Sequence, residues 1–156
     1  MSSRAKTALL ILAVILVAAF ATQTAAVAQE QRYRDEVFAS VAITADTAYG
    51  QAPDENANPV TLRLDLYQPS GDTEPSRPAF VWIHGGGFTG GDKADPLNTT
   101  IATRFARRGY VTASINYRLR PGHYFEQGDP ELTLAILDAQ HDAQAAVRWL
   151  RANAAT

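Results

Sequence analysis

Four consecutive residues, His84-Gly85-Gly86-Gly87, form the motif with the clearest chemical meaning in this sequence of 156 residues. Because glycine has no Cβ, successive peptide N–H groups can point into one space and approach a bound oxygen atom closely. Such a group of donors stabilises negative charge, either on a phosphate or on an oxyanion that develops during a reaction. The motif follows the apolar segment 79–83, so a strand is expected to lead into the glycine loop.

A P-loop is the first of two phosphate-binding interpretations. Gly86 and Gly91 have the spacing of the two P-loop glycines, but the residues that follow are Asp92 and Lys93. A P-loop has lysine directly after the second glycine, followed by serine or threonine that contributes to magnesium binding. An aspartate at that position repels phosphate, and this interpretation is excluded.

A dinucleotide-binding loop is the second interpretation. Gly85-x-Gly87-x-x-Gly90 matches the glycine fingerprint of a Rossmann-like domain, and a predicted strand precedes it. The fingerprint normally opens directly into a helix, whereas residues 92–96 include two aspartates and a proline and extend the loop. A dinucleotide-binding Rossmann-like domain is therefore kept as an alternative to an oxyanion site.

Composition excludes several other kinds of site. The net charge is −2, and without residues 1–28 the chain has 12 basic and 16 acidic residues, or −4, with no basic patch for nucleic acid. The absence of cysteine excludes disulfides, thiol catalysis and thiolate metal sites. The three histidines, His84, His123 and His141, are not spaced as a metal cluster, so no metal site is expected.

The N-terminus has the pattern of an export signal. Arg4 and Lys6 precede an uninterrupted apolar stretch at 8–21, and the Ala-Val-Ala triplet at 26–28 matches a cleavage site. The apolar stretch is shorter than the ~20 residues of a membrane-spanning helix. We expect a signal peptide at 1–28, a domain at 29–156, a secreted or periplasmic location and no stable membrane anchor after cleavage.

Alternation of apolar residues predicts two N-terminal strands. The segments 37–44 and 60–67 both alternate with a period of two residues, and residues 46–58 between them are rich in turn-forming residues. Two amphipathic strands joined in this way are typical of an antiparallel pair at the edge of a sheet. Residues 46–58 are accordingly expected to form a connection.

The rest of the chain alternates strands with helices. The apolar segment 79–83 does not alternate, which suggests a strand buried on both faces. A helix at 98–108 ending at Gly109, a strand at 110–117 and a helix at 131–153 starting after Asp129-Pro130 complete the order. This β-α-β-α order predicts an α/β fold in which the two antiparallel strands lead into a parallel sheet flanked by helices.

Five stretches together resemble the N-terminal half of an α/β-hydrolase of the carboxylesterase/lipase kind. They occur in the family's order and spacing: LDLYQP at 64–69, WIHGGGF at 82–88, GGDK at 90–93, SINYRL at 114–119 and DAQAAVRWL at 142–150. In that family an HGGG loop after a central strand forms the oxyanion hole. The resemblance covers most of the chain beyond the signal peptide.

The resemblance implies roles for the loop residues. The backbone N–H groups of Gly86 and Gly87, with Gly85 as a third candidate, would stabilise the oxyanion formed during ester cleavage, and His84 would orient the loop. The implied substrate is a small-molecule ester, and the implied reaction depends on serine and needs no cofactor. The alternative role of the glycines is only to form a tight turn.

The nucleophile that this chemistry requires is missing from the sequence. None of the six serines lies in G-x-S-x-G, and Ser114, within a predicted strand, is expected to be structural. We expect the chain to be truncated before the nucleophile elbow and inactive alone, with a non-catalytic binding module as the other possibility. Two roles stay open for Arg118 at the end of a predicted parallel strand: a site residue, or the ion-pair partner of an acid such as Asp142. The helix side bearing Asp138, His141 and Asp142 is expected to face solvent or a loop.

Overall fold

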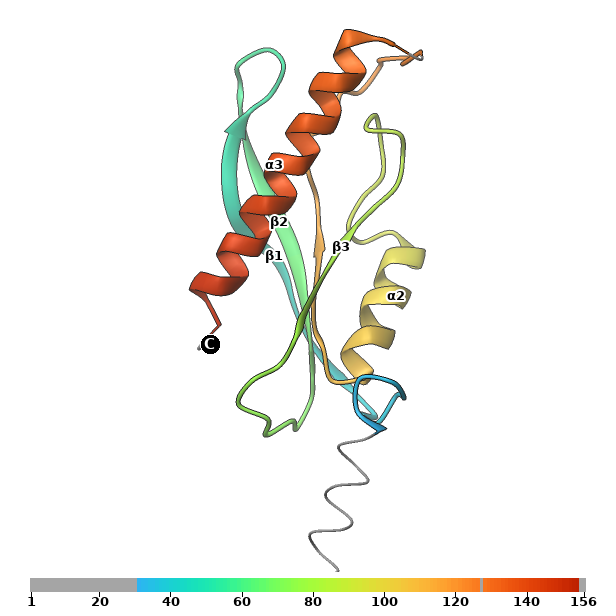
Figure 1. The fold of residues 1–156 in the computed structure, drawn as a ribbon, viewed down its shortest axis with the longest axis vertical. Helices are drawn as coiled ribbons and strands as arrows, with labels where there is room; N and C mark the ends of the chain where they lie inside the picture. The colour runs from blue at the N-terminus through green and yellow to red at the C-terminus, as the bar shows by residue number, and fades with distance from the viewer. Residues whose placement is uncertain (1–30, 127, 155–156) are drawn as a thin grey trace, which may run out of the picture.

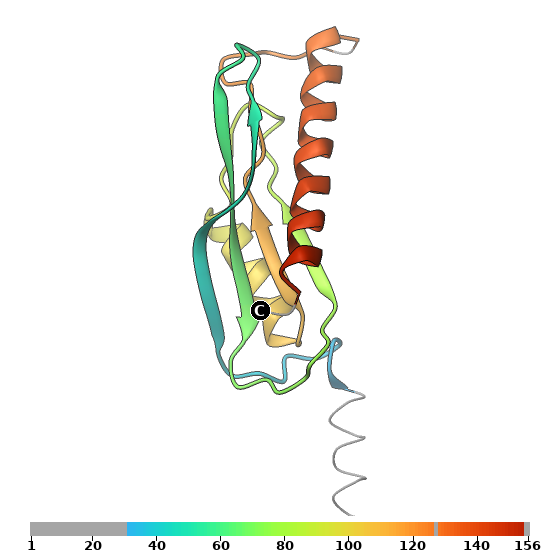
Figure 2. The same cartoon turned by 90° about the vertical axis from the view of Figure 1, so that its left-hand side faces the viewer.

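A computed structural model describes residues 31–126 and 128–154, in which a four-stranded mixed sheet carries one helix on each face (Figures 1 and 2). The order of the strands across the sheet is β1-β2-β4-β3. β1 and β4 both run antiparallel to β2, and β3 runs parallel to β4. The elements in chain order are β1 (Val41–Pro53), β2 (Pro59–Pro69), β3 (Ala79–Ile83), α2 (Pro96–Arg107), β4 (Val111–Ile115) and α3 (Pro130–Ala152).

The predicted α/β class is confirmed, including the antiparallel β1–β2 pair at one edge of the sheet. The predicted signal peptide at 1–28 lies outside the described residues. Within 31–126 and 128–154, none of the helices combines the length and the apolar character that crossing a bilayer requires.

The first strand differs from its prediction. β1 begins at Val41 and continues to Pro53, so much of the predicted connection at 46–58 is strand. Its pairing with β2 shifts register between Thr44 and Thr47 and again between Ala48 and Gly50. Such bulges break the two-residue alternation, which explains why the pattern predicted a strand at 37–44 but not its continuation to Pro53.

The position of β3 also differs from its prediction. The apolar sequence of β3 suggested burial on both faces, but β4 lies between β2 and β3 and leaves β3 at the edge of the described sheet. Ile83, the last residue of β3, is accordingly 44% exposed. A short apolar strand carries no information on which neighbours it has, so composition alone did not reveal the edge position.

Each face of the sheet packs against its own helix, as Figure 2 shows. On the α3 face the buried core consists of Tyr49, Leu62, Leu64, Ala113, Ile115 and Ala146. On the α2 face Tyr67 packs with Ala102 and Ala106, and the rings of Phe80 and Phe105 stack with centroids 4.1 Å apart. Leu64 and Tyr67 point to opposite faces because side chains alternate along β2.

The helix ends follow local sequence signals. The side chain of Asp129 accepts a hydrogen bond from the N–H of Glu131 at 2.9 Å, and Pro130 occupies the first position of α3. Gly109 has a φ of 101° just after α2, a conformation that glycine adopts readily. Both predicted helix boundaries are thus confirmed to within a few residues.

The sheet brings two loops to the same edge. Ile83 and Ile115 are paired in the parallel ladder, and they are the last residues of β3 and β4. The loop that starts with His84 and the loop that starts with Asn116 therefore leave the sheet side by side. This carboxyl edge is where α/β folds usually place their sites.

Candidate oxyanion site

His84 is buried at the base of the glycine loop. It is 4% exposed, and its ring stacks on that of Tyr117 with centroids 4.5 Å apart. The Tyr117 hydroxyl donates a hydrogen bond to the carbonyl oxygen of His84 at 3.2 Å. The His84 ring is therefore held between the ends of two neighbouring parallel strands.

The other contact of His84 fixes its tautomer. Its Nδ1 atom lies 2.7 Å from the carbonyl oxygen of Gly85. A carbonyl oxygen only accepts hydrogen bonds, so Nδ1 must carry the hydrogen in this arrangement. Nε2 is buried and has no partner within residues 31–126 and 128–154.

The His84–Gly85 contact also orients the N–H of Gly86. The carbonyl of Gly85 and the N–H of Gly86 belong to one planar peptide unit, so fixing the oxygen fixes the direction of the N–H. The next peptide is fixed in the same way. The carbonyl oxygen of Gly86 accepts hydrogen bonds from the N–H of Thr89 at 3.1 Å, the N–H of Gly90 at 3.2 Å and the Thr89 hydroxyl at 3.2 Å.

The N–H groups of Gly86 and Gly87 have no acceptor among the described residues. The carbonyls of Gly85 and Gly86 accept hydrogen bonds within the loop, so the N–H groups of Gly86 and Gly87 are oriented but are not themselves engaged in those bonds. Two adjacent, pre-oriented N–H groups are what an oxyanion hole requires.

Glycine is required at Gly86 for steric reasons. Its φ is 120°, and a Cβ there would lie 2.0 Å from the carbonyl oxygen of Gly90. A Cβ at Gly85 or at Gly87 would meet no atom within 4 Å, but Gly87 has a φ of 61°. The positive φ of Gly86 and Gly87 turns the chain so sharply that the two N–H groups come out of the strand direction.

The far side of the loop is tied to α2 and β4. Asn98 at the start of α2 accepts a hydrogen bond from the Trp82 indole at 2.9 Å and donates one to the Asp92 carbonyl at 2.7 Å. Burial opposes ionisation of Asp92, but hydrogen bonds from the Ala94 N–H and the Asn116 amide outweigh it and lower its pKa below the ordinary value. The loop is therefore held at Asp92 as well as at the glycines.

Of the two roles left open for Arg118, the structure shows the ion pair with Asp142. Arg118 Nη2 lies 2.9 Å from Asp142 Oδ1, and the Arg118 N–H donates to Asp142 Oδ2 at 2.9 Å. Hydrogen bonding to Asp142, partly opposed by burial, raises the pKa of Arg118 above its ordinary value. Arg120 pairs with Asp138 at 2.9 Å, and its N–H donates to the Phe88 carbonyl at 2.8 Å, which joins this ion-pair network to the glycine loop.

The remaining candidates are not brought to the loop as reacting groups. Ser114 is fully buried and its hydroxyl donates to the Lys93 carbonyl at 2.9 Å, which confirms a structural role. His123 lies 3.0 Å from Glu55, and His141 is exposed on α3.

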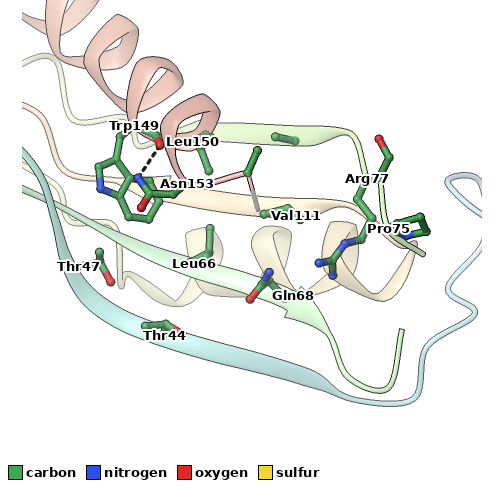
Figure 3. A pocket seen from close by; sticks show the side chains of 13 residues that line it. Thr44, Thr47, Leu66, Gln68, Pro75, Arg77, Val111, Trp149, Leu150 and Asn153 are labelled. Atoms are coloured by element: carbon green, nitrogen blue, oxygen red, sulfur yellow. Dashed lines mark hydrogen bonds between the residues drawn. The ribbon is translucent and has the colours of Figure 1, made fainter. Parts of the chain in front are cut away.

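A separate hollow of about 410 Å³ lies at the other end of the sheet (Figure 3). Its lining includes Ala79 and Val111, the first residues of β3 and β4, together with Trp149 and Leu150 near the end of α3. The glycine loop leaves the opposite ends of these strands, so this hollow is separate from the candidate site at the glycines.

The dinucleotide alternative requires a helix that starts at the glycines. α2 instead begins at Pro96, beyond Gly90, Gly91 and the turn at Asp92. The three glycines of the fingerprint therefore do not open directly into a helix, as a dinucleotide-binding loop requires.

Sequence reasoning missed Lys93 as a partner of Asp65, and Tyr117 as the residue that stacks on His84. Asp65 falls on the polar side of the alternating pattern at 60–67, together with Thr61 and Arg63, so no pattern in the sequence indicated that it is buried. No sequence signal predicted the second, because it depends on β4 lying next to β3.

Comparison with known proteins identifies the group to which these features belong. A family model described as BD-FAE matches residues 64–156. Phenmedipham hydrolase of Pseudarthrobacter oxydans is 42% identical over 96 residues, which are 60% of this chain and 18% of that protein. Cocaine esterase of Oryctolagus cuniculus is 36% identical over 98 residues, 60% of this chain and 17% of that protein.

Solved structures of esterases share the fold. Esterase B from Lactobacillus rhamnosis, in a phosphonate-inhibited form, superposes with a TM-score of 0.51 at 27% identity, over 88% of this chain and 38% of that one. Esterase 2 of Thermogutta terrifontis, phosphorylated by paraoxon, gives 0.51 at 28% identity, over 76% and 38%. The matched part is less than a fifth of the curated relatives and less than half of these structures.

Proposed function

Because this chain belongs to the BD-FAE family, with the fold of α/β-hydrolase esterases, we propose that residues 29–156 form the oxyanion-stabilising part of a serine-dependent carboxylic ester hydrolase. The substrate class is a small-molecule carboxylic ester. The relatives are named as hydrolases and esterases, and the matched segment includes the whole glycine loop.

The observation that carries this proposal is the pair of N–H groups at Gly86 and Gly87, which have no acceptor within residues 31–126 and 128–154. Attack on an ester carbonyl turns its oxygen into an oxyanion, and each donor aimed at that oxygen lowers the barrier by ~3 kcal/mol. Both peptides are fixed through their carbonyl oxygens, at 2.7 Å to His84 Nδ1 and at 3.1 Å to Thr89 N. Donors that need no reorganisation stabilise the transition state more than donors that must first turn.

His84 acts in this proposal by orienting the loop and not as the base. Its Nδ1 hydrogen is engaged with Gly85, and its ring is stacked on Tyr117. The nucleophile and the base are assigned to sequence outside these 156 residues, since none of the serines present lies in G-x-S-x-G. The reaction proposed uses no cofactor.

The experiment is an ester-hydrolysis assay on the complete polypeptide that carries this segment. We expect turnover of p-nitrophenyl butyrate that is lost on stoichiometric reaction with paraoxon, a reagent that phosphorylates esterase 2 of Thermogutta terrifontis. A folded complete polypeptide that hydrolyses none of the p-nitrophenyl esters from acetate to decanoate would overturn the proposal.

Export is the second part of the proposal. It rests on the charged n-region, the apolar stretch at 8–21 and the Ala-Val-Ala triplet at 26–28. N-terminal sequencing of protein recovered from the periplasm or medium is expected to begin at Gln29. Recovery of an intact N-terminus in the cytosolic fraction alone would contradict it.

A further inference from the structure

Lys93 is a buried lysine held by two carboxylates. Its Nζ lies 2.9 Å from Asp65 Oδ1 and 3.0 Å from Asp46 Oδ1. The side chains of Lys93 and Asp65 are only 8% and 6% exposed, whereas that of Asp46 is 69% exposed. Burial opposes the charge on Lys93, but its hydrogen bonds to Asp65 and Asp46 outweigh burial and raise its pKa above the ordinary value.

The backbone of Lys93 is fixed as firmly as its side chain. Its N–H donates to the Asn116 side-chain oxygen at 2.6 Å, and its carbonyl accepts from the Ser114 hydroxyl at 2.9 Å. Ser114 lies in β4 and Asp65 in β2, so one residue of the loop is attached to two neighbouring strands. Lys93 is the point at which the glycine loop is fastened to the sheet.

The backbone next to Lys93 packs directly against the part of the loop that carries the N–H donors. A Cβ on Gly91 would lie 2.4 Å from the carbonyl oxygen of Gly85 and 2.5 Å from His84 Nδ1. These are the two atoms whose contact orients the Gly86 N–H. The backbone of Gly91, two residues before Lys93, therefore packs against that contact with no room for another atom.

We propose that Lys93 is a positioning residue for the oxyanion donors. With its ammonium held by Asp65 and Asp46, it clamps Gly91 against the His84–Gly85 contact and so fixes the direction of the Gly86 N–H. Its consequence for catalysis rests on the proposed function, but its effect on the loop does not. Asp65, the buried partner, acts through Lys93.

The test compares Lys93→Met with a matched control, Arg32→Met, in the 156-residue chain. Methionine keeps the unbranched stem of lysine and removes its charge. Arg32 forms an ion pair with Asp72, and their side chains are 10% and 3% exposed, so Arg32→Met breaks an equally buried pair. Arg32 lies next to Gly109, beyond α2, and not at the glycine loop. The readout is the amide cross-peaks of Gly86 and Gly87 in ¹H–¹⁵N spectra, with their relaxation dispersion.

We expect K93M to shift the Gly86 and Gly87 cross-peaks and to introduce exchange broadening, while R32M leaves both as in the unmodified chain. Asp65→Asn should change them as K93M does, and Asp46→Asn less, because Asp46 is mostly exposed. If K93M lowers the melting temperature as R32M does but leaves both cross-peaks unchanged, the positioning role is wrong. If K93M does not fold, the smaller change D65N decides on the same readout.

A second arm uses the complete polypeptide. K93M is expected to lower kcat by roughly tenfold or more with little change in KM, because a misdirected donor weakens transition-state binding only. R32M should change neither. If K93M shifts the cross-peaks but the unmodified complete polypeptide is inactive, the proposed ester hydrolase is wrong and the positioning role of Lys93 stands. If the complete polypeptide is active but K93M changes neither the cross-peaks nor kcat, the positioning role is wrong and the ester hydrolase stands.

Discussion

His84 Nδ1 lies 2.7 Å from the carbonyl oxygen of Gly85, the residue that follows it in the chain. This short-range contact determines how the next N–H, that of Gly86, points, because the carbonyl and the N–H share one rigid peptide unit. The contact is closed from behind by Gly91, where even a Cβ would lie 2.5 Å from Nδ1. Within the motif, His84 thus fixes the orientation of a glycine peptide, and the glycines present the N–H groups.

Removing Asp142 tests the ion pair that joins the loop after β4 to α3. Asp142 is 2% exposed and holds Arg118 through both carboxylate oxygens. Asp142→Ala is expected to lower the free energy of unfolding by about 3 kcal/mol, because it leaves a buried guanidinium with less compensation. Urea unfolding followed by tryptophan fluorescence measures the change.

The control for that measurement is Asp35→Ala. Asp35 pairs with Arg34 on the surface, where the two side chains are 51% and 69% exposed. An exposed pair contributes less than about 1 kcal/mol. If D142A and D35A lower the free energy of unfolding equally, the Arg118–Asp142 pair stabilises the fold no more than an exposed pair does.

Asp72 makes stability depend on pH in the acidic range. Burial favours the neutral form, but the Arg32 hydrogen bonds and the Glu74 N–H outweigh it, so the pKa of Asp72 lies below its ordinary 3.8. A carboxyl with a lowered pKa in the folded state stabilises the fold above the unfolded pKa, and this contribution is lost as pH falls through the folded value. Unfolding free energy should therefore decrease as pH falls below about 4.

Asp72→Asn tests this linkage. The variant should be less stable than the unmodified chain at neutral pH, and its stability should decrease less steeply below about pH 4. Thermal unfolding at a series of pH values measures both quantities. Parallel pH profiles for the two proteins would mean that Asp72 does not titrate with a lowered pKa.

The chain of 156 residues is expected to be catalytically silent on its own. It contains the N–H donors but no serine in G-x-S-x-G, and Ser114 is fully buried with its hydroxyl engaged to Lys93. We expect no hydrolysis of p-nitrophenyl butyrate above the rate in buffer. Turnover that survives repurification and is abolished by paraoxon would contradict this expectation.

Much of the fold was predictable because its signals are local. The alternation in β2, the Asp129-Pro130 start of α3 and Gly109 after α2 all depend on neighbouring residues, and the structure confirms them. The extent of β1 was misjudged because its two register shifts, between Thr44 and Thr47 and between Ala48 and Gly50, interrupt the period of two. The edge position of β3 depends on strand order, which local patterns do not contain.

The site was predictable in part for the same reason. The motif identified the glycines and His84, and the structure adds that each donor peptide is fixed through its own carbonyl. The attachment of Lys93 to Asp65 joins residues that are distant in sequence. It becomes visible only when β2 and β4 are placed side by side.

The central claim is that the Gly86 and Gly87 N–H groups form an oxyanion hole, and kcat of the complete polypeptide carrying Gly86→Ala tests it most directly. A Cβ at Gly86 would lie 2.0 Å from the Gly90 carbonyl oxygen, so alanine must turn these peptides. The control is Gly90→Ala, whose Cβ meets nothing within 4 Å. Circular dichroism of both variants confirms that they are folded before the rates are compared.

We predict that G86A lowers kcat for p-nitrophenyl butyrate by about 100-fold or more, the effect of losing one oxyanion donor, while G90A stays within a few-fold of the unmodified enzyme. A folded G86A variant with the kcat of G90A would contradict the account.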